Sequence, residues 1–244
     1  MYNVQSEFLS DDSDIMLKDR ILDYFKKGDL RSIEYKRNAI VMFMLKGISM
    51  LVSLLYVPLL LNTLDTENYG IWLTLTSIVS WVAMMDIGLG NGLRNKLATS
   101  LAQKNIQLSK RLVSSAYIAL SLYIILFIII FYFCIFKIVS WNSILNATTI
   151  SKDNLNALVL VVFISFGFQF VLNLINSILL ALQKPATSSF LTTLGQILSF
   201  ICVLICVKIF KIHSLLVLGS IVALSPVIVL LVSSVISVSA ASVS

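Results

Sequence analysis

The residues with the clearest chemical potential are amides and hydroxyls along one face of an apolar segment, residues 155–182. Their spacing follows steps of four, four, three and seven, at Ser165, Gln169, Asn173, Asn176 and Gln183. Such steps place side chains on one face of a helix. Because an unpaired amide in hydrocarbon costs several kcal/mol, this face must avoid lipid. Neutral donors and acceptors of this kind would suit the hydroxyl groups of a sugar.

Two other apolar segments carry similar polar stripes. Their members are Lys46, Ser49, Ser53 and Tyr56 in the first segment, and Ser189, Thr192, Gln196 and Ser199 in the later one. For a single hydroxyl, hydrogen bonding between helices is a sufficient explanation. A stripe with several amides favours a hydrated cavity instead. The candidate substrate-binding residues are Lys46, Ser49, Ser53, Gln169, Asn173, Asn176 and Gln196.

Two charges fall inside or at the edge of apolar segments. A charged residue at the bilayer centre costs roughly 2.5 to 3.5 kcal/mol, so such a residue usually has a partner or a task. Helical rise places Lys46 about 10 Å and Asp86 about 6 Å from the same membrane edge. Lys46 either extends toward the headgroups or attracts a phosphate or pyrophosphate. Asp86 either pairs with Lys46 or Arg94 or carries a proton, so Asp86 and Arg94 are candidates for gating or coupling.

The segments that hold these residues are typical of a membrane protein. The 244 residues are 58% hydrophobic and 12% charged, which leaves too little polar surface for a water-soluble globule. Six apolar runs are long enough to cross about 30 Å of hydrocarbon. They cover 39–61, 70–90, 112–136, 155–182, 186–210 and 214–238. The fold class is therefore all-α and polytopic, with six transmembrane helices over 39–238.

The basic residues predict the orientation of these helices. If the amino terminus is cytoplasmic, thirteen of the 18 Lys and Arg residues lie inside, on 1–38, on the connection 91–111 and at Lys184. This distribution follows the positive-inside rule, and it accounts for the net charge of +6 without nucleic acid. Residues 1–38 form either an amphipathic helix at the inner surface or a solvated tail. An outer connection is expected at 137–154.

The remaining features argue against chemistry at a metal or nucleophile. Cys202 and Cys206 share a helical face but have no His, Asp or Glu nearby, so they are interpreted as small packing residues, with no metal or cofactor. No pair of carboxylates or nucleophile with its base is evident in the apolar runs, so an enzyme is not expected. Residues 239–244 form a short Ser/Ala/Val tail without a basic flank, which suggests a truncated product.

Three stretches resemble a known family. They are Lys46–Ser49 followed by Val57–Leu59, then Tyr69–Thr74, and above all Asp86–Ala98, DIGLGNGLRNKLA. In these stretches the chain resembles the Wzx-type polysaccharide flippases. These proteins translocate O-antigen and capsule units and belong to the multidrug/oligosaccharidyl-lipid/polysaccharide superfamily. Members have two six-helix lobes that face each other across a central cavity. The resemblance implies that this chain supplies the amino-terminal lobe.

The resemblance also implies a cargo and a location. The cargo would be a lipid-linked oligosaccharide, typically on undecaprenyl pyrophosphate, moved across the bacterial inner membrane by alternating access. Besides membrane lipids, the expected partners are a missing second lobe, a homodimer partner or polysaccharide polymerase machinery. If none completes the cavity, the product is inactive. The alternatives are a lobe of a multidrug or cation exporter and a non-transporting membrane scaffold in polysaccharide assembly.

Overall fold

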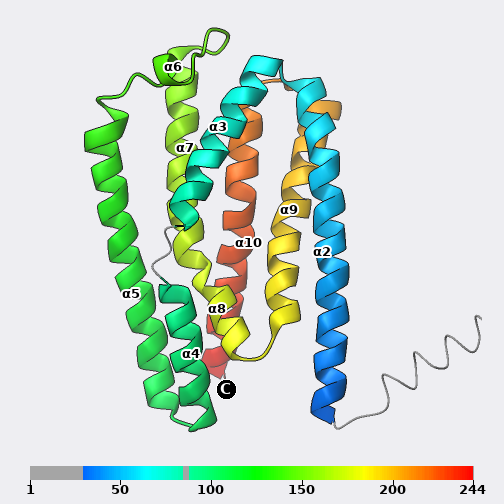
Figure 1. The fold of residues 1–244 in the computed structure, drawn as a ribbon, viewed down its shortest axis with the longest axis vertical. Coiled ribbons are helices and arrows are strands. Elements are labelled where there is room, and N and C mark those ends of the chain that lie inside the picture. The colour runs from blue at the N-terminus through cyan, green and yellow to red at the C-terminus, as the bar shows by residue number, and fades with distance from the viewer. Residues whose placement is uncertain (1–29, 85–87, 244) are drawn as a thin grey trace, which may run out of the picture. The chain divides into compact units, whose positions relative to one another are not determined.

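The computed structural model describes residues 30–84 and 88–243, in which every regular element is a helix (Figure 1). The helices are, in chain order, α2 (Leu30–Thr63), α3 (Thr66–Met84), α4 (Leu89–Ala102), α5 (Ile106–Ile130), η1 (Phe131–Phe136, a π-helix), α6 (Trp141–Ile144), α7 (Lys152–Leu172), α8 (Leu174–Ala181), α9 (Pro185–Lys208) and α10 (Leu215–Val243). The prediction of an all-α polytopic membrane protein is confirmed.

Five of the described helical segments are long and apolar enough to cross a membrane. They are Lys36–Thr63, Ile106–Cys134, Lys152–Ala181, Pro185–Lys208 and Leu215–Ile236. The span predicted over 70–90 corresponds to α3 and the start of α4, on either side of residues 85–87. Glu67 and Asn68 occupy the first turn of α3, which shortens its apolar part. The count of six spans stays a prediction.

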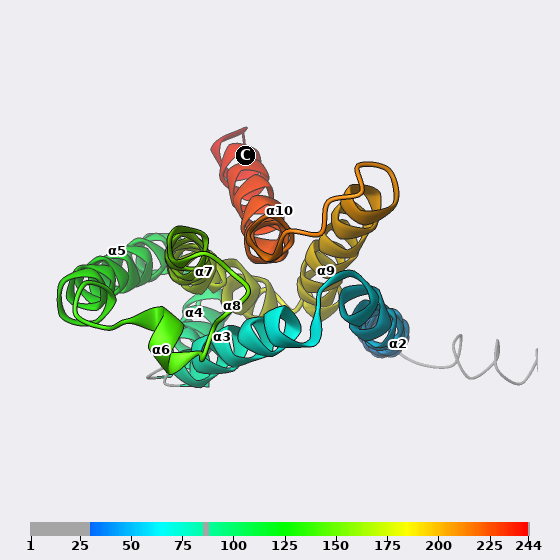
Figure 2. The ribbon, with the colours of Figure 1, turned by 90° about the horizontal axis from the view of Figure 1, so that it is seen from above.

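The chain divides into two compact units, Met1–Met44 and Leu45–Ser244. Within the second unit, α10 packs against both α7 and α9, while α4 packs against α5 and α8. Figure 2 shows α7, α10 and α9 in this order when the helices are seen from above. Following the predicted orientation, we call the end with the α2–α3 turn and α6 the outer end, and the end with the α4–α5 and α8–α9 turns the inner end (Figure 1).

The largest apolar cluster, which we call the outer core, joins side chains of α2, α3, η1, α6, α7, α9 and α10. Its fully buried members are Leu75, Leu155, Leu158, Val159 and Val203, each 0% exposed. Close approach of α10 depends on a glycine: a Cβ at Gly219 would lie 2.7 Å from Leu158 Cδ1 and 3.1 Å from the Trp72 ring. Small residues allow such close packing where the surrounding lipid is as apolar as the core.

The inner connection predicted over 91–111 is largely helical. Gly88 precedes α4 with φ 71°, a left-handed conformation that glycine adopts without steric cost. After α4, Asn105 caps α5 by accepting a hydrogen bond from the Leu108 amide at 3.0 Å. Sequence reasoning missed α4 because the segment has low hydropathy and contains three consecutive polar residues, Arg94, Asn95 and Lys96. Such a composition is typical of a solvated loop.

Candidate functional site

A cavity of about 540 Å³ lies at the junction of α7 and α8, where α3, α4, α5 and α9 also contribute to its wall. Its polar lining residues are Ser80, Gln169, Asn173, Asn176, Ser177 and Thr192. Leu120, Phe166, Phe170 and Leu174 provide apolar wall. Three of the predicted residues, Gln169, Asn173 and Asn176, are therefore brought together, as the helical stripe predicted.

The backbone at the α7–α8 junction explains why these amides face a cavity. The Asn173 amide donates to the Gln169 carbonyl at 2.8 Å, and the Asn176 amide donates to the Asn173 carbonyl at 3.0 Å. The second bond spans three residues instead of four, so the helix tightens and its regular ladder is interrupted. Irregular backbone at membrane depth is tolerated where it is covered by protein or lines a water-filled space.

Hydrogen bonds hold the amide side chains in place. Asn176 Nδ2 donates to Asn173 Oδ1 at 2.7 Å, and Ser188 Oγ on α9 donates to Asn176 Oδ1 at 2.9 Å. Gln169 Nε2 donates to the Ala223 carbonyl of α10 at 3.0 Å. Among the described residues, Gln169 Oε1 and Asn173 Nδ2 have no such partner. These two amide groups are therefore available to a bound molecule or water in the cavity.

The cavity wall is electrically neutral as far as the structure describes it. No Asp, Glu, Lys, Arg or His is among the described lining residues. Amides and hydroxyls next to phenylalanine rings can bind a neutral polar molecule that offers both hydroxyls and apolar faces. This arrangement suits a sugar better than it suits a cation or an anion.

The other polar stripe residues form a seam between α2 and α9. Ser49 Oγ donates to Gln196 Oε1, and the Tyr56 and Ser199 hydroxyls lie 2.7 Å apart. Thr192 lines the cavity one helical turn before Gln196, so a single face of α9 carries both the seam and part of the cavity wall. The predicted residues therefore divide between two neighbouring places instead of one.

The charged candidates lie elsewhere. Lys46 and Ser53 are exposed on α2, and Arg94 is exposed on α4; none of the three lines the cavity. Asp86 falls outside the described residues, so its predicted pairing with Lys46 or Arg94 stays a prediction. Ser165, the first residue of the stripe on α7, is buried in the protein and does not reach the cavity either.

Sequence reasoning missed some contributors to the site. Ser177 follows Asn173 by four residues, so the same helical step could have found it. Ser80 sits among hydroxyl residues that back-bond along α3, where its Oγ donates to the Thr76 carbonyl at 2.8 Å. Nothing in its spacing distinguishes it from its neighbours. Ser188 lies at the start of α9 and acts through Asn176 instead of lining the cavity.

A separate polar contact joins α3 to the outer connection. The Glu67 carboxylate accepts hydrogen bonds from the Thr148 amide, from Thr148 Oγ1 at 2.7 Å and from the Thr149 amide at 2.8 Å. These bonds, with the Thr148 hydroxyl contributing most, stabilise the charged form and lower the pKa of Glu67 from 4.5 to about 2. The sequence gives no local sign of this contact, because its partners are about eighty residues apart.

The fold and the cavity define a multi-pass helical membrane protein with a neutral polar site among its helices. Comparison with known proteins gives the particular family. The chain belongs to the family described as polysaccharide biosynthesis protein, whose model matches residues 35–241. This confirms the resemblance to the Wzx-type polysaccharide flippases.

One relative and the solved structures complete the comparison. A protein of Yersinia pseudotuberculosis to which O-antigen export is ascribed is 36% identical over 73 residues, which cover 30% of this chain and 16% of that relative. The matched part is thus well below two thirds of the relative's length. No solved structure matches the chain.

Proposed function

We propose that the chain is one lobe of a flippase that moves lipid-linked oligosaccharides across the bacterial inner membrane by alternating access. The cargo would be O-antigen or capsule units linked to undecaprenyl pyrophosphate. The observation that carries the proposal is the neutral polar cavity of about 540 Å³ among helices long enough to span a membrane. Family membership supports polysaccharide as the cargo class.

Each candidate residue receives a role in this proposal. Gln169 Oε1 and Asn173 Nδ2 accept and donate hydrogen bonds to glycan hydroxyls, while Asn176 holds Asn173 in place. Ser49, Ser53 and Gln196 continue the polar path along α2 and α9. Lys46 attracts the pyrophosphate, and Asp86 and Arg94 act in gating or coupling. With the amino terminus in the cytoplasm, the inner end of the lobe would receive the cargo.

The proposal requires a second lobe to close the cavity. A further polypeptide segment, a second copy of this chain or another protein could supply it, and polymerase machinery could associate with the assembled transporter. A second copy differs measurably from the other two sources. A homodimer predicts twice the mass of the chain in mild detergent, whereas a distinct partner predicts that the chain alone restores no transport.

Complementation tests the proposal. The chain, alone and joined to a second lobe, is expressed in a strain that lacks its O-antigen flippase, and surface glycan is measured. Replacing both Gln169 and Asn173 by Leu removes their two proposed hydrogen bonds to the glycan, worth about 1 kcal/mol each, so we expect about a thirtyfold loss of glycan transport. Asn154→Leu, at the other end of α7, is the matched control and should transport normally.

Two outcomes would overturn the proposal. If neither form restores surface glycan although the protein reaches the membrane, the flippase assignment fails. That result would favour the non-transporting scaffold instead. If the Gln169 and Asn173 Leu variant transports normally, the cavity is not the glycan path.

Lys46→Ala tests the phosphate role separately, because it should lower transport more than it lowers protein abundance. A cation exporter would need acids in the cavity, and none is among its described lining residues.

A further inference from the structure

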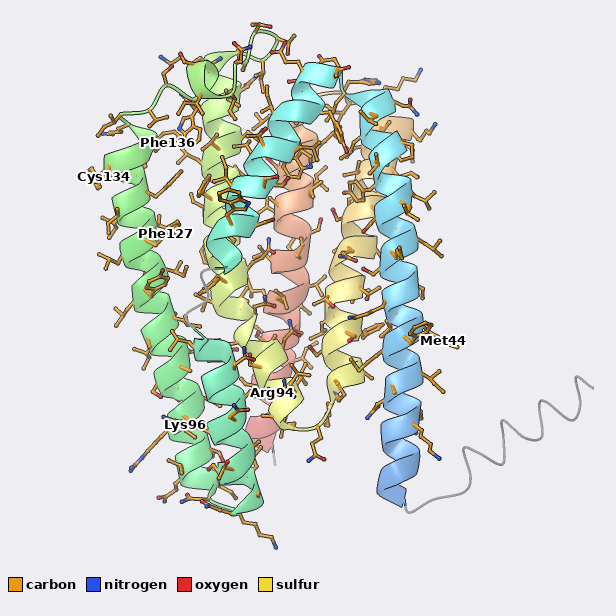
Figure 3. All side chains as sticks on the ribbon, viewed as in Figure 1. Met44, Arg94, Lys96, Phe127, Cys134 and Phe136 are labelled. Atoms are coloured by element: carbon orange, nitrogen blue, oxygen red, sulfur yellow. The ribbon has the colours of Figure 1, made fainter. Side chains whose placement is uncertain are left out.

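At the outer end, α5 continues directly into the π-helix η1. This segment, Phe131–Phe136, has the sequence FYFCIF. A π-helical turn contains an extra residue, and such turns occur frequently at functional sites. Here the segment separates its aromatic rings into an inward and an outward group. Figure 3 labels Phe127 and Phe136 on this stretch.

The inward group belongs to the outer core. Phe131 is buried and stacks on Phe163 of α7, with ring centroids 4.0 Å apart and an interplanar angle of 16°. Trp141 of α6 lies 6.2 Å from Phe131 between ring centroids. These contacts fix the π-helix against α7. The position of the outward rings is therefore set by the core behind them.

The outward rings of Tyr132 and Phe133, together with the outer edge of the inward group, line an apolar groove of about 240 Å³ between the α5–η1 segment and α7. Its wall includes Phe127, Phe131, Tyr132, Phe133, Leu160 and Ile164. These residues lie in, or directly beside, segments that can cross a membrane. A molecule in this groove must therefore contribute hydrocarbon, and the nearest source is a lipid chain.

A cation, Lys137, lies beside the groove. Lys137 Nζ lies 5.5 Å from the centroid of the Tyr132 ring and 5.9 Å from that of Phe133. Both rings line the groove, so the cation is held at its edge by cation–π contacts instead of extending freely. Lys137 follows the apolar span Ile106–Cys134 by three residues, which places it near headgroup depth.

We propose that this groove and Lys137 form a binding site for an anionic membrane phospholipid at the outer end of the lobe. One acyl chain occupies the apolar groove, and the phosphate of the headgroup pairs with the Lys137 ammonium group. A phospholipid fits better than the lipid-linked cargo because the described lining is apolar apart from the Tyr132 phenol and has no amide side chain for a glycan. The site is independent of the polar cavity, and it does not depend on the proposed transport function.

Lipid quenching of a tryptophan tests this site on the whole chain. Phe133→Trp places an indole in the groove and keeps an aromatic ring under Lys137. The protein is reconstituted in phosphatidylcholine vesicles that contain brominated phosphatidylglycerol or, as the matched lipid, brominated phosphatidylcholine. The chain without Phe133→Trp gives the background from its own three Trp residues.

We expect brominated phosphatidylglycerol to quench the indole at about a fivefold lower mole fraction than brominated phosphatidylcholine, the effect of one basic residue near an anionic lipid. Lys137→Gln should abolish this preference and Lys137→Arg should keep it. Lys152→Gln is the matched control, since it removes an exposed cation at the start of α7 at the same end of the lobe. That variant should keep the preference.

Three results would overturn the proposal. Equal quenching by the two brominated lipids would show that the groove does not select an anionic headgroup. Loss of the preference in Lys152→Gln as well as Lys137→Gln would assign it to diffuse surface charge. Displacement of brominated phosphatidylglycerol by undecaprenyl phosphate at a lower mole fraction than by unbrominated phosphatidylglycerol would assign the site to the cargo lipid. If Lys137→Gln does not fold, Lys137→Met, which keeps an unbranched side chain without the charge, replaces it, and a retained preference in that variant would overturn the proposal.

Discussion

The outer core and the polar cavity share three helices, α3, α7 and α9, and α7 contributes side chains to both. Over Leu155–Phe163, α7 contributes fully buried aliphatic and aromatic side chains to the outer core. From Gln169 onward, its side chains line a polar space, and its backbone is interrupted at Asn173. The contrast indicates that stability is concentrated at the outer end. The cavity, between the outer core and the inner turns, keeps unpaired polar atoms that a bound molecule or water can satisfy.

The largest expected effect comes from breaking the outer core. Leu158→Ala should lower the free energy of unfolding by about 2 kcal/mol or more, because it leaves a cavity at a side chain that is 0% exposed. Leu126→Ala is the matched control, since that side chain is 57% exposed on α5. Unfolding in mixed micelles with increasing denaturing detergent measures both variants. Equal losses for Leu158→Ala and Leu126→Ala would contradict the view that stability resides in the outer core.

The next effect on the free energy of unfolding is smaller. It compares a hydroxyl that has a hydrogen-bond partner with a buried hydroxyl that has none. Ser188→Ala removes the donor to Asn176 Oδ1 and should cost about 1 kcal/mol. Ser165 is 1% exposed, and its Oγ has no hydrogen-bond partner in the described part of the chain. Ser165→Ala should therefore be neutral or stabilising in the same unfolding assay. If Ser165→Ala costs as much as Ser188→Ala, Ser165 has a polar partner in the folded protein and the comparison fails.

The smallest effect is the pH dependence of the outer connection. Since folding lowers the pKa of Glu67 from 4.5 to about 2, its contribution to stability is present above about pH 4.5. The contribution is lost as the pH falls toward 2. The difference in Tm between the natural chain and Glu67→Gln should thus be seen at pH 7 and shrink as the pH is lowered.

The Glu67 prediction has an internal control. Thr148→Val removes the hydroxyl donor but leaves the Thr148 and Thr149 amides in place. It should therefore reduce the pH-dependent difference without abolishing it. A difference between the natural chain and Glu67→Gln that stays constant from pH 7 to pH 3 would show that the carboxylate is not held by the outer connection.

Local patterns predicted the fold class and the amide stripe because both depend on spacing within one helix. Gln169, Asn173 and Asn176 meet in the cavity for this reason. Sequence patterns could not predict which stripe residues share a site. Ser49, for example, forms a hydrogen bond with Gln196 only because α2 lies beside α9. They also missed α4, whose helix forms against α5 and α8 despite its low hydropathy. The Glu67 contact with Thr148 and the groove beside η1 depend likewise on tertiary packing.

Water access to the two regions tests the central claim most directly, namely that the inner end holds a hydrated site for a polar cargo. Single cysteines are placed at Ser177 in the cavity and at Val159 in the outer core, after Cys134, Cys202 and Cys206 have been replaced by Ala. A hydrophilic, membrane-impermeant thiol reagent is then added to inside-out vesicles. We predict fast labelling of Ser177→Cys and none of Val159→Cys. An unreactive Ser177→Cys, or equal labelling of the two positions, would contradict the account.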